Sequence, residues 1–160
     1  MSPSGGEKLR SSGVRFPPPL LYLAGLVAGW LLHRFVHPLP TFQDWPRYLL
    51  AGAFTIAGLA LPISTRISFH RAGTSILPIR PTTALVTGGP FRFSRNPAYL
   101  GMAMLYAGIG FWIGSWWPLC LLPLVLLGIQ QFVITKEERY LESLFGEDYR
   151  AYQRRVRRWL

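Results

Sequence analysis

The feature that most constrains this chain is a stretch of forty residues without a charged side chain, from Asn96 to Thr135. A helix that crosses about 30 Å of hydrocarbon needs about 20 residues. The uncharged stretch is therefore too long for one crossing and suits two. Gly114, Ser115 and Pro118 stand near its middle, where a tight turn would fall. The sequence predicts an antiparallel pair of membrane helices.

A hairpin of this kind brings the segments on either side of it to the same membrane face. The segment before the hairpin is LVTGGPFRFSRNP, residues 85–97, which is basic and has two adjacent glycines. The segment after it is KEERYLESLFG, residues 136–146, with paired glutamates near its start. We therefore expect an arginine-bearing glycine turn to lie beside two carboxylates.

Long apolar blocks elsewhere predict an all-α integral membrane protein with four transmembrane helices. We expect a flexible cytosolic tail over residues 1–15 and a single membrane domain over 16–160. An ordered, mostly non-helical cytosolic loop is expected over 64–96, before the third helix. The C-terminal helices are expected to be cytosolic and amphipathic, with the last one lying on anionic lipid. The expected helices cover about 18–36, 45–63, 96–114, 116–145 and 147–159.

The distribution of basic residues predicts the orientation of the chain. Of its 17 Lys and Arg residues, all but Arg34 and Arg47 fall in the tail, the loop or the C-terminal part. The positive-inside rule places both termini in the cytoplasm, and we expect a bacterial inner membrane protein. The net charge of +10 comes without a nucleic-acid-binding motif, so we expect no nucleic-acid partner. Small-residue pairs in the first two helices permit oligomers.

Polar side chains recur at helical spacing where the fourth helix leaves the membrane. Gln131 and Glu138 fall on one face of that helix, with Glu137 beside it. On the third helix, Tyr99, Met102 and Tyr106 share a face. If the two faces meet, they form a cavity with aromatic walls on one side and amides and carboxylates on the other.

Each of these features also has an ordinary structural interpretation. The glutamates fit a solvated helix face, the arginines fit topology markers, and the tyrosines fit core or interface aromatics. Gly88 and Gly89 fit a common turn. The expected convergence of all four at one membrane face favours a functional site. His33, His37 and His70 have no partners at metal-ligand spacing, and a single cysteine, Cys120, allows no internal disulfide.

The residues from about Thr82 to Trp159 resemble the isoprenylcysteine carboxyl methyltransferase family, whose relatives include phospholipid N-methyltransferases. The resemblance is carried by LVTGGPFRFSRNPAYLG, the uncharged hairpin and EERYLESLFGEDYRAYQRRV. It implies a membrane enzyme that uses S-adenosylmethionine. Asn96 and Thr83 stand where the isoprenylcysteine enzymes have histidines, which weakens the case for isoprenylcysteine as the substrate.

The resemblance and the polar pattern together give the candidate site residues. The cofactor is expected to contact Leu85, Gly89, Arg95, Asn96, Pro97, Tyr99, Met102, Tyr106, Gln131, Glu137 and Glu138. No metal ligand is expected. Arg95, Arg92, Arg139 or Arg150 would orient a carboxylate acceptor, and Glu138 is the first candidate for the base toward an amine or thiol.

The sequence therefore predicts an S-adenosylmethionine-dependent methyltransferase for a lipid or apolar acceptor at the cytosolic membrane face. Two alternatives remain open at this level. One is an NADPH-dependent membrane reductase of a lipid or sterol, since that scaffold is similar. The other is a small membrane scaffold of the same fold without catalysis.

Overall fold

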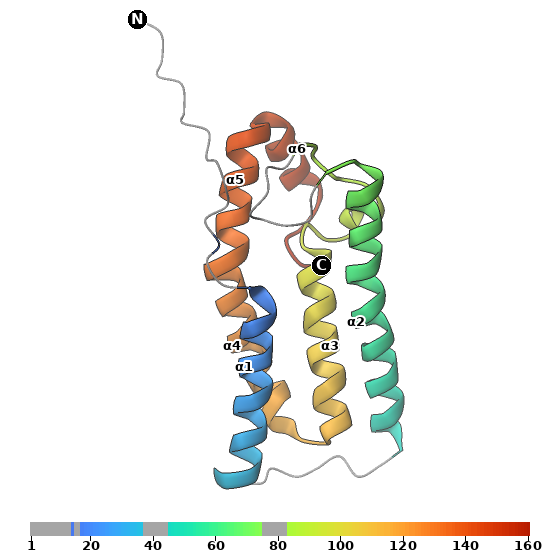
Figure 1. The fold of residues 1–160 in the computed structure, drawn as a ribbon, viewed down its shortest axis with the longest axis vertical. Coiled ribbons are helices and arrows are strands. Elements are labelled where there is room, and N and C mark those ends of the chain that lie inside the picture. The colour runs from blue at the N-terminus through green and yellow to red at the C-terminus, as the bar shows by residue number, and fades with distance from the viewer. Residues whose placement is uncertain (1–13, 15–16, 37–44, 75–82) are drawn as a thin grey trace, which may run out of the picture.

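The structure is a computed structural model that describes Val14 and residues 17–36, 45–74 and 83–160. The regular elements among the described residues are all helices, and no β-strand occurs among these residues. Four long helical segments run side by side, and the short C-terminal helix caps one end of the bundle (Figure 1). The expected tail, apart from Val14, and the loop positions 75–82 lie outside the described residues.

The helices have clear boundaries. The membrane-length segments begin at prolines or follow tight turns, as the sequence predicts. The elements are α1 (Pro18–Leu31), η1 (Leu32–Val36), α2 (Pro46–Arg71), η2 (Gly89–Arg92), α3 (Pro97–Ile113), α4 (Trp116–Ile129), η3 (Gln130–Ile134), α5 (Thr135–Phe145) and α6 (Glu147–Arg155).

The turn in the middle of the uncharged stretch lies where it was expected. Gly114 ends α3 in the left-handed conformation, with φ of 74°, which glycine adopts without a steric penalty. The next residue, Ser115, caps α4 by accepting a hydrogen bond from the backbone N–H of Trp117 at 3.3 Å. The two helices therefore form a hairpin. The beginning of α3 and the end of the helical segment that follows the turn point toward the same end of the bundle.

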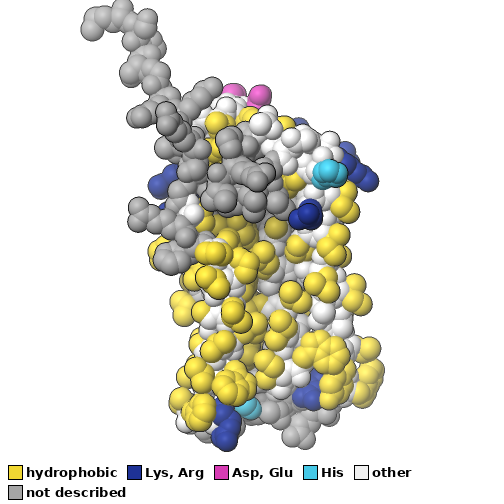
Figure 2. Space-filling view, viewed as in Figure 1, with side chains coloured by type: hydrophobic (Ala, Val, Ile, Leu, Met, Phe, Trp, Pro, Cys, Tyr) yellow, Lys and Arg dark blue, Asp and Glu magenta, His cyan; other side chains and the backbone are white. Residues whose placement is uncertain are grey.

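In the part of the chain that the structure describes, three helical segments are long and apolar enough to cross a membrane: Pro18–Val36, Pro46–Arg71 and Trp116–Phe145. The fourth, α3, is apolar but has 17 residues. Hydrophobic side chains cover the middle of the bundle, and Lys and Arg side chains gather toward its two ends (Figure 2). This distribution is typical of a membrane protein.

The second helix is longer than predicted, since α2 continues to Arg71 rather than ending near Ile63. The hydroxyl groups of Thr65 and Ser68 donate to carbonyl groups one turn earlier in the same helix, at 2.8 and 2.9 Å. Because their polar groups are satisfied inside the helix, these residues do not interrupt it. The first part of the predicted loop over 64–96 is therefore helical.

The last helix is shorter than predicted, since α6 ends at Arg155 and the chain beyond it is extended. The tyrosines of α6 do not face lipid either. Tyr149 and Tyr152 are buried and pack against Phe91. The apolar face of the last helix therefore covers the protein core, contrary to the expected interfacial helix.

Candidate active site

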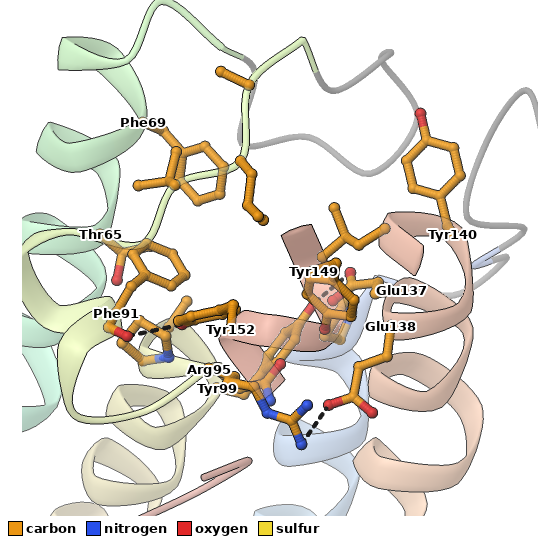
Figure 3. Close-up of a pocket in the computed structure, with 18 of the residues that line it drawn as sticks. Thr65, Phe69, Phe91, Arg95, Tyr99, Glu137, Glu138, Tyr140, Tyr149 and Tyr152 are labelled. Atoms are coloured by element: carbon orange, nitrogen blue, oxygen red, sulfur yellow. Dashed lines mark hydrogen bonds and ion pairs between the residues drawn. The ribbon is translucent and has the colours of Figure 1, made fainter. Parts of the chain in front are cut away.

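A cavity of about 320 Å³ lies at the end of the bundle, between the beginning of α3 and the first half of α5. Figure 3 shows side chains from α2, α3, α5 and α6 converging on it. Most of the wall is apolar or aromatic. The charged side chains in the wall are Arg95, Glu137 and Glu138. Of the segment before the hairpin, Arg95 meets Glu138 of the segment after it, whereas Gly88 and Gly89 do not line the cavity.

Glu138 is held by two guanidinium groups. Nη2 of Arg95 lies 3.2 Å from its Oε1. Arg158 donates from Nε to Oε1 at 3.1 Å and from Nη2 to Oε2 at 2.5 Å. The hydrogen bonds to Glu138 raise the pKa of Arg158. Both carboxylate oxygens of Glu138 are therefore occupied by cationic donors.

Glu137 has different surroundings although it is the neighbouring residue. Successive residues on an α-helix point about 100° apart, so the two glutamates meet different partners. The hydroxyl of Tyr99 donates to Oε1 of Glu137 at 2.7 Å. Among the described residues, no hydrogen-bond donor or cation occupies Oε2 of Glu137. This carboxylate therefore keeps an oxygen available on the cavity wall.

Arg95 is buried and only partly satisfied. Its side chain is 11% exposed, and its buried Nε has no hydrogen-bond partner among the residues that the structure describes. A buried N–H without a partner costs free energy, so such a group is a candidate for contact with a ligand. The cavity wall thus carries a guanidinium group with unused hydrogen-bonding capacity and a carboxylate with an available oxygen.

Aromatic side chains form the opposite wall. The rings of Phe69 and Phe91 pack edge to face, with 5.5 Å between the ring centroids. Tyr152 donates its hydroxyl to the backbone carbonyl of Phe91 at 2.8 Å, and burial raises the pKa of Tyr152 to about 12. Burial also raises the pKa of Tyr149. These buried, uncharged rings suit a wall that packs against a flat or cationic group.

Comparison with known proteins identifies the family. The sequence model of the phospholipid methyltransferase family matches residues 46–148, which is more than half of the chain. The chain belongs to the phospholipid methyltransferase family. The family segment includes the cavity residues of α2, α3 and α5, and the resemblance inferred from the sequence is confirmed.

Two curated proteins are similar to parts of the chain. An uncharacterized protein of Haemophilus influenzae is 40% identical over 62 residues, which are 39% of this chain and 98% of that protein. The protein-S-isoprenylcysteine O-methyltransferase of Schizosaccharomyces pombe is 36% identical over 72 residues, which are 45% of this chain and 30% of the yeast enzyme. The match thus spans less than a third of the yeast enzyme. No solved structure matches the chain.

The structure brings most of the predicted site residues of this family member to one cavity. The predicted residues that line it are Leu85, Arg95, Asn96, Pro97, Tyr99, Met102, Glu137 and Glu138. Asn96 holds the N-cap position of α3, but its side chain makes no capping bond; its Nδ2 donates instead to the carbonyl of Arg158 at 3.0 Å. Among the described residues, no group of three or more possible metal ligands occurs.

Four predicted residues do not line the cavity. Arg139 and Gln131 are exposed on the outside of the bundle. Tyr106 is buried deeper among the helices, where it lines a second, apolar cavity. Gly89 begins η2 with φ of 60°, and a Cβ there would lie 2.8 Å from Oγ of Ser68. Its role is to let the turn approach α2.

A π-helical turn explains the position of Gln131. The predicted face assumes an unbroken α-helix, but η3 inserts one extra residue into the turn. The helix face is thereby rotated, so Gln130 rather than Gln131 points inward. Oε1 of Gln130 accepts a hydrogen bond from Nε1 of Trp159 at 3.2 Å.

Sequence analysis missed Arg158, which makes the closest contacts to Glu138. The basic run near the C-terminus was interpreted as the polar end of a lipid-bound helix. Four arginines within that run look alike in the sequence, and only the end of α6 distinguishes them. The sequence offered one indication: the residues after Tyr152 include arginines but no Asp or Glu, so an arginine there needs a carboxylate partner from elsewhere in the chain.

Proposed function

We propose that this protein is an S-adenosylmethionine-dependent methyltransferase that acts on a lipid or other apolar acceptor at the cytosolic membrane face. The observation that carries the proposal is the cavity itself. It sets an arginine with an unpaired N–H and two glutamates against aromatic walls, at the end of an apolar helix bundle. The family supports methyl transfer, and the reductase and scaffold alternatives find no support in it.

The residues present fit S-adenosylmethionine. A cavity of about 320 Å³ has the size expected for a small-molecule site. The guanidinium of Arg95 suits the cofactor's carboxylate, and the aromatic walls suit its cationic sulfonium. Phe91 and Tyr149 offer flat walls to an adenine ring. When bound, this cofactor would supply an activated methyl group.

For an amine or thiol acceptor we assign the proton-accepting role to Glu137. Glu138 was the first candidate, but guanidinium groups occupy both of its oxygens. Glu137 keeps one oxygen available and is oriented by the hydroxyl of Tyr99. With its available oxygen, Glu137 would take the proton that an amine or thiol acceptor loses when it receives the methyl group that the cofactor would supply. Arg139 is exposed and has no place in this assignment.

An adjoining apolar cavity supports an apolar acceptor. It has a volume of about 400 Å³ and lies among α1, α2 and α3. Pro19 and Met102 line both cavities, so the two adjoin. The helices around the second cavity carry exposed apolar side chains such as Leu23, Leu59 and Ile63. A hydrocarbon chain in the bilayer would reach the site along these surfaces without crossing water.

We further propose that α3 crosses the membrane as a fourth span, with both termini in the cytoplasm of a bacterium. Its 17 residues would span about 26 Å at 1.5 Å per residue, which a slightly thinned bilayer accommodates. Inside the bundle, α3 and α4 form an antiparallel hairpin (Figure 1). If α4 crossed the membrane and α3 did not, the two paired helices would lie at different depths in the membrane. The basic residues near the cavity favour its cytosolic location.

Ligand binding tests the proposed function directly. S-adenosylhomocysteine at 100 times its Kd is expected to stabilise the purified protein in detergent by about 2.7 kcal/mol, because it binds only the folded state. NADPH is expected to give no shift. The midpoint of thermal unfolding measures both. A shift with NADPH and none with S-adenosylhomocysteine would favour the reductase and reject the methyltransferase.

Cysteine accessibility tests the fourth span. In a Cys120→Ser background, Phe93→Cys and Trp116→Cys place thiols just outside the two ends of α3 at exposed positions. An impermeant maleimide is expected to label Trp116→Cys in right-side-out membrane vesicles and Phe93→Cys in inverted ones. Labelling of both from the same side would show that α3 does not cross.

A further inference from the structure

The five residues after α6, Val156–Leu160, form a C-terminal segment that returns to the beginning of α3. Figure 1 shows the C-terminus beside the first turns of that helix. The backbone N–H of Arg95 donates to the carbonyl of Arg157 at 3.0 Å. The carbonyl of Arg158 accepts from Oγ of Ser94 at 3.2 Å and from Nδ2 of Asn96 at 3.0 Å. The segment is therefore fixed to the stretch that carries Arg95.

The other side of the same segment is fixed to the fourth long helix. Trp159 packs against the core and bonds to Gln130, one side chain of the π-helical turn. Arg158 reaches Glu138 on α5. The C-terminal segment thus bridges the two elements that supply the cavity's charged groups, although it is not itself part of the cavity wall.

Arg95 and Arg158 share the carboxylate of Glu138 unequally. Two guanidinium groups meet one carboxylate, and Arg158 takes the larger share of it with two N–H donors. Arg95 keeps one contact at 3.2 Å, and its Nε is left without a partner. If Arg158 were absent, the planar fork of Arg95 could turn onto both oxygens of Glu138, which is the geometry that guanidinium–carboxylate pairs prefer.

We propose that Arg158 is a positioning residue that occupies Glu138 and thereby keeps the guanidinium of Arg95 available for the carboxylate of the bound cofactor. This inference rests on the proposed function, because it assumes that the cofactor's carboxylate faces Arg95. Arg158 acts from outside the cavity and touches no ligand. Without Arg158, the charges of Arg95 and Glu138 would neutralise each other, and the site would bind the cofactor less tightly.

Two cofactor-related ligands separate this role from a structural one. S-adenosylhomocysteine carries the carboxylate, whereas 5′-methylthioadenosine has the same nucleoside and thioether without it. Replacing Arg158 with alanine is expected to raise the Kd for S-adenosylhomocysteine roughly 10- to 100-fold, the effect of losing one charged hydrogen bond. The Kd for methylthioadenosine is expected to stay unchanged. Isothermal titration of the full-length protein in detergent measures both.

The matched control is Arg155→Ala, which removes the same charge from an exposed side chain three residues earlier. It is expected to bind both ligands as the wild type does. Arg158→Lys keeps the charge but not the two-donor fork, so its affinity for S-adenosylhomocysteine is expected to lie between those of the alanine variant and the wild type.

The outcomes distinguish this inference from the proposed function. If wild-type protein binds neither ligand, the proposed function itself fails. If the wild type binds S-adenosylhomocysteine and Arg158→Ala binds it equally well, the positioning role is wrong. An equal loss of affinity for both ligands would show that Arg158 only supports the fold, and would also overturn the inference.

Discussion

Glu137→Gln is expected to lower kcat/KM for methyl transfer to an amine or thiol about 1000-fold, the usual contribution of a positioned proton acceptor. The amide keeps the shape of the side chain and can still accept the hydrogen bond from Tyr99. It loses the negative charge and the ability to take a proton. Transfer of radiolabelled methyl groups into phospholipid vesicles made from a bacterial lipid extract measures the effect.

Glu142→Gln is the matched control for this prediction. Glu142 lies on the same helix, but it is 38% exposed and pairs with the exposed Arg150 at 2.7 Å. A surface pair of this kind contributes little, so the variant is expected to retain wild-type activity. If Glu137→Gln were as active as Glu142→Gln, Glu137 would not be the proton acceptor, and an acceptor that needs no base, such as a carboxylate, would be favoured.

The meeting of Arg95 and Glu138 followed from the length of the uncharged stretch alone. Forty uncharged residues with a glycine turn at the middle fit a bilayer as an antiparallel pair of helices. This hairpin places the charged segments on either side of it at the same membrane face. The turn at Gly114 and the start of α3 at Pro97 were likewise readable, since each depends on the backbone of one or two residues. Local chemistry and one length constraint were sufficient for these features.

The features that sequence reasoning missed depend on contacts between distant residues. The π-helical turn at Gln130–Ile134 rotates the inward face by one position, and no residue type marks it. The end of α6 depends on hydrogen bonds from Ser94, Arg95 and Asn96 to the C-terminal segment. An arginine-rich helix end is equally compatible with lipid headgroups, so the partner of Arg158 was visible only in three dimensions.

The close approach of α2 and α3 is the packing feature on which the cavity most depends. A Cβ at Gly58 would lie 2.5 Å from the backbone nitrogen of Leu105, and one at Gly101 would lie 2.5 Å from Cδ of Pro62. Backbone atoms cannot move aside as side chains do, so any larger residue at Gly58 must separate the two helices. Because α2 carries Phe69 to the cavity, separation would also open the site.

Gly58→Leu is accordingly expected to destabilise the protein by about 3 kcal/mol or more, at the upper end of the cost of overpacking. It is also expected to abolish S-adenosylhomocysteine binding, although Gly58 does not line that cavity. Gly52→Leu is the matched control, since it lies on the same helix and a Cβ there meets nothing within 4 Å. Replacing this glycine removes a poor helix former, so the control is expected to be as stable as the wild type or slightly more stable.

The midpoint of thermal unfolding in detergent and the Kd for S-adenosylhomocysteine measure both variants. Equal midpoints for the two would mean that α2 and α3 do not touch at Gly58, and the arrangement of the cavity walls would have to be revised.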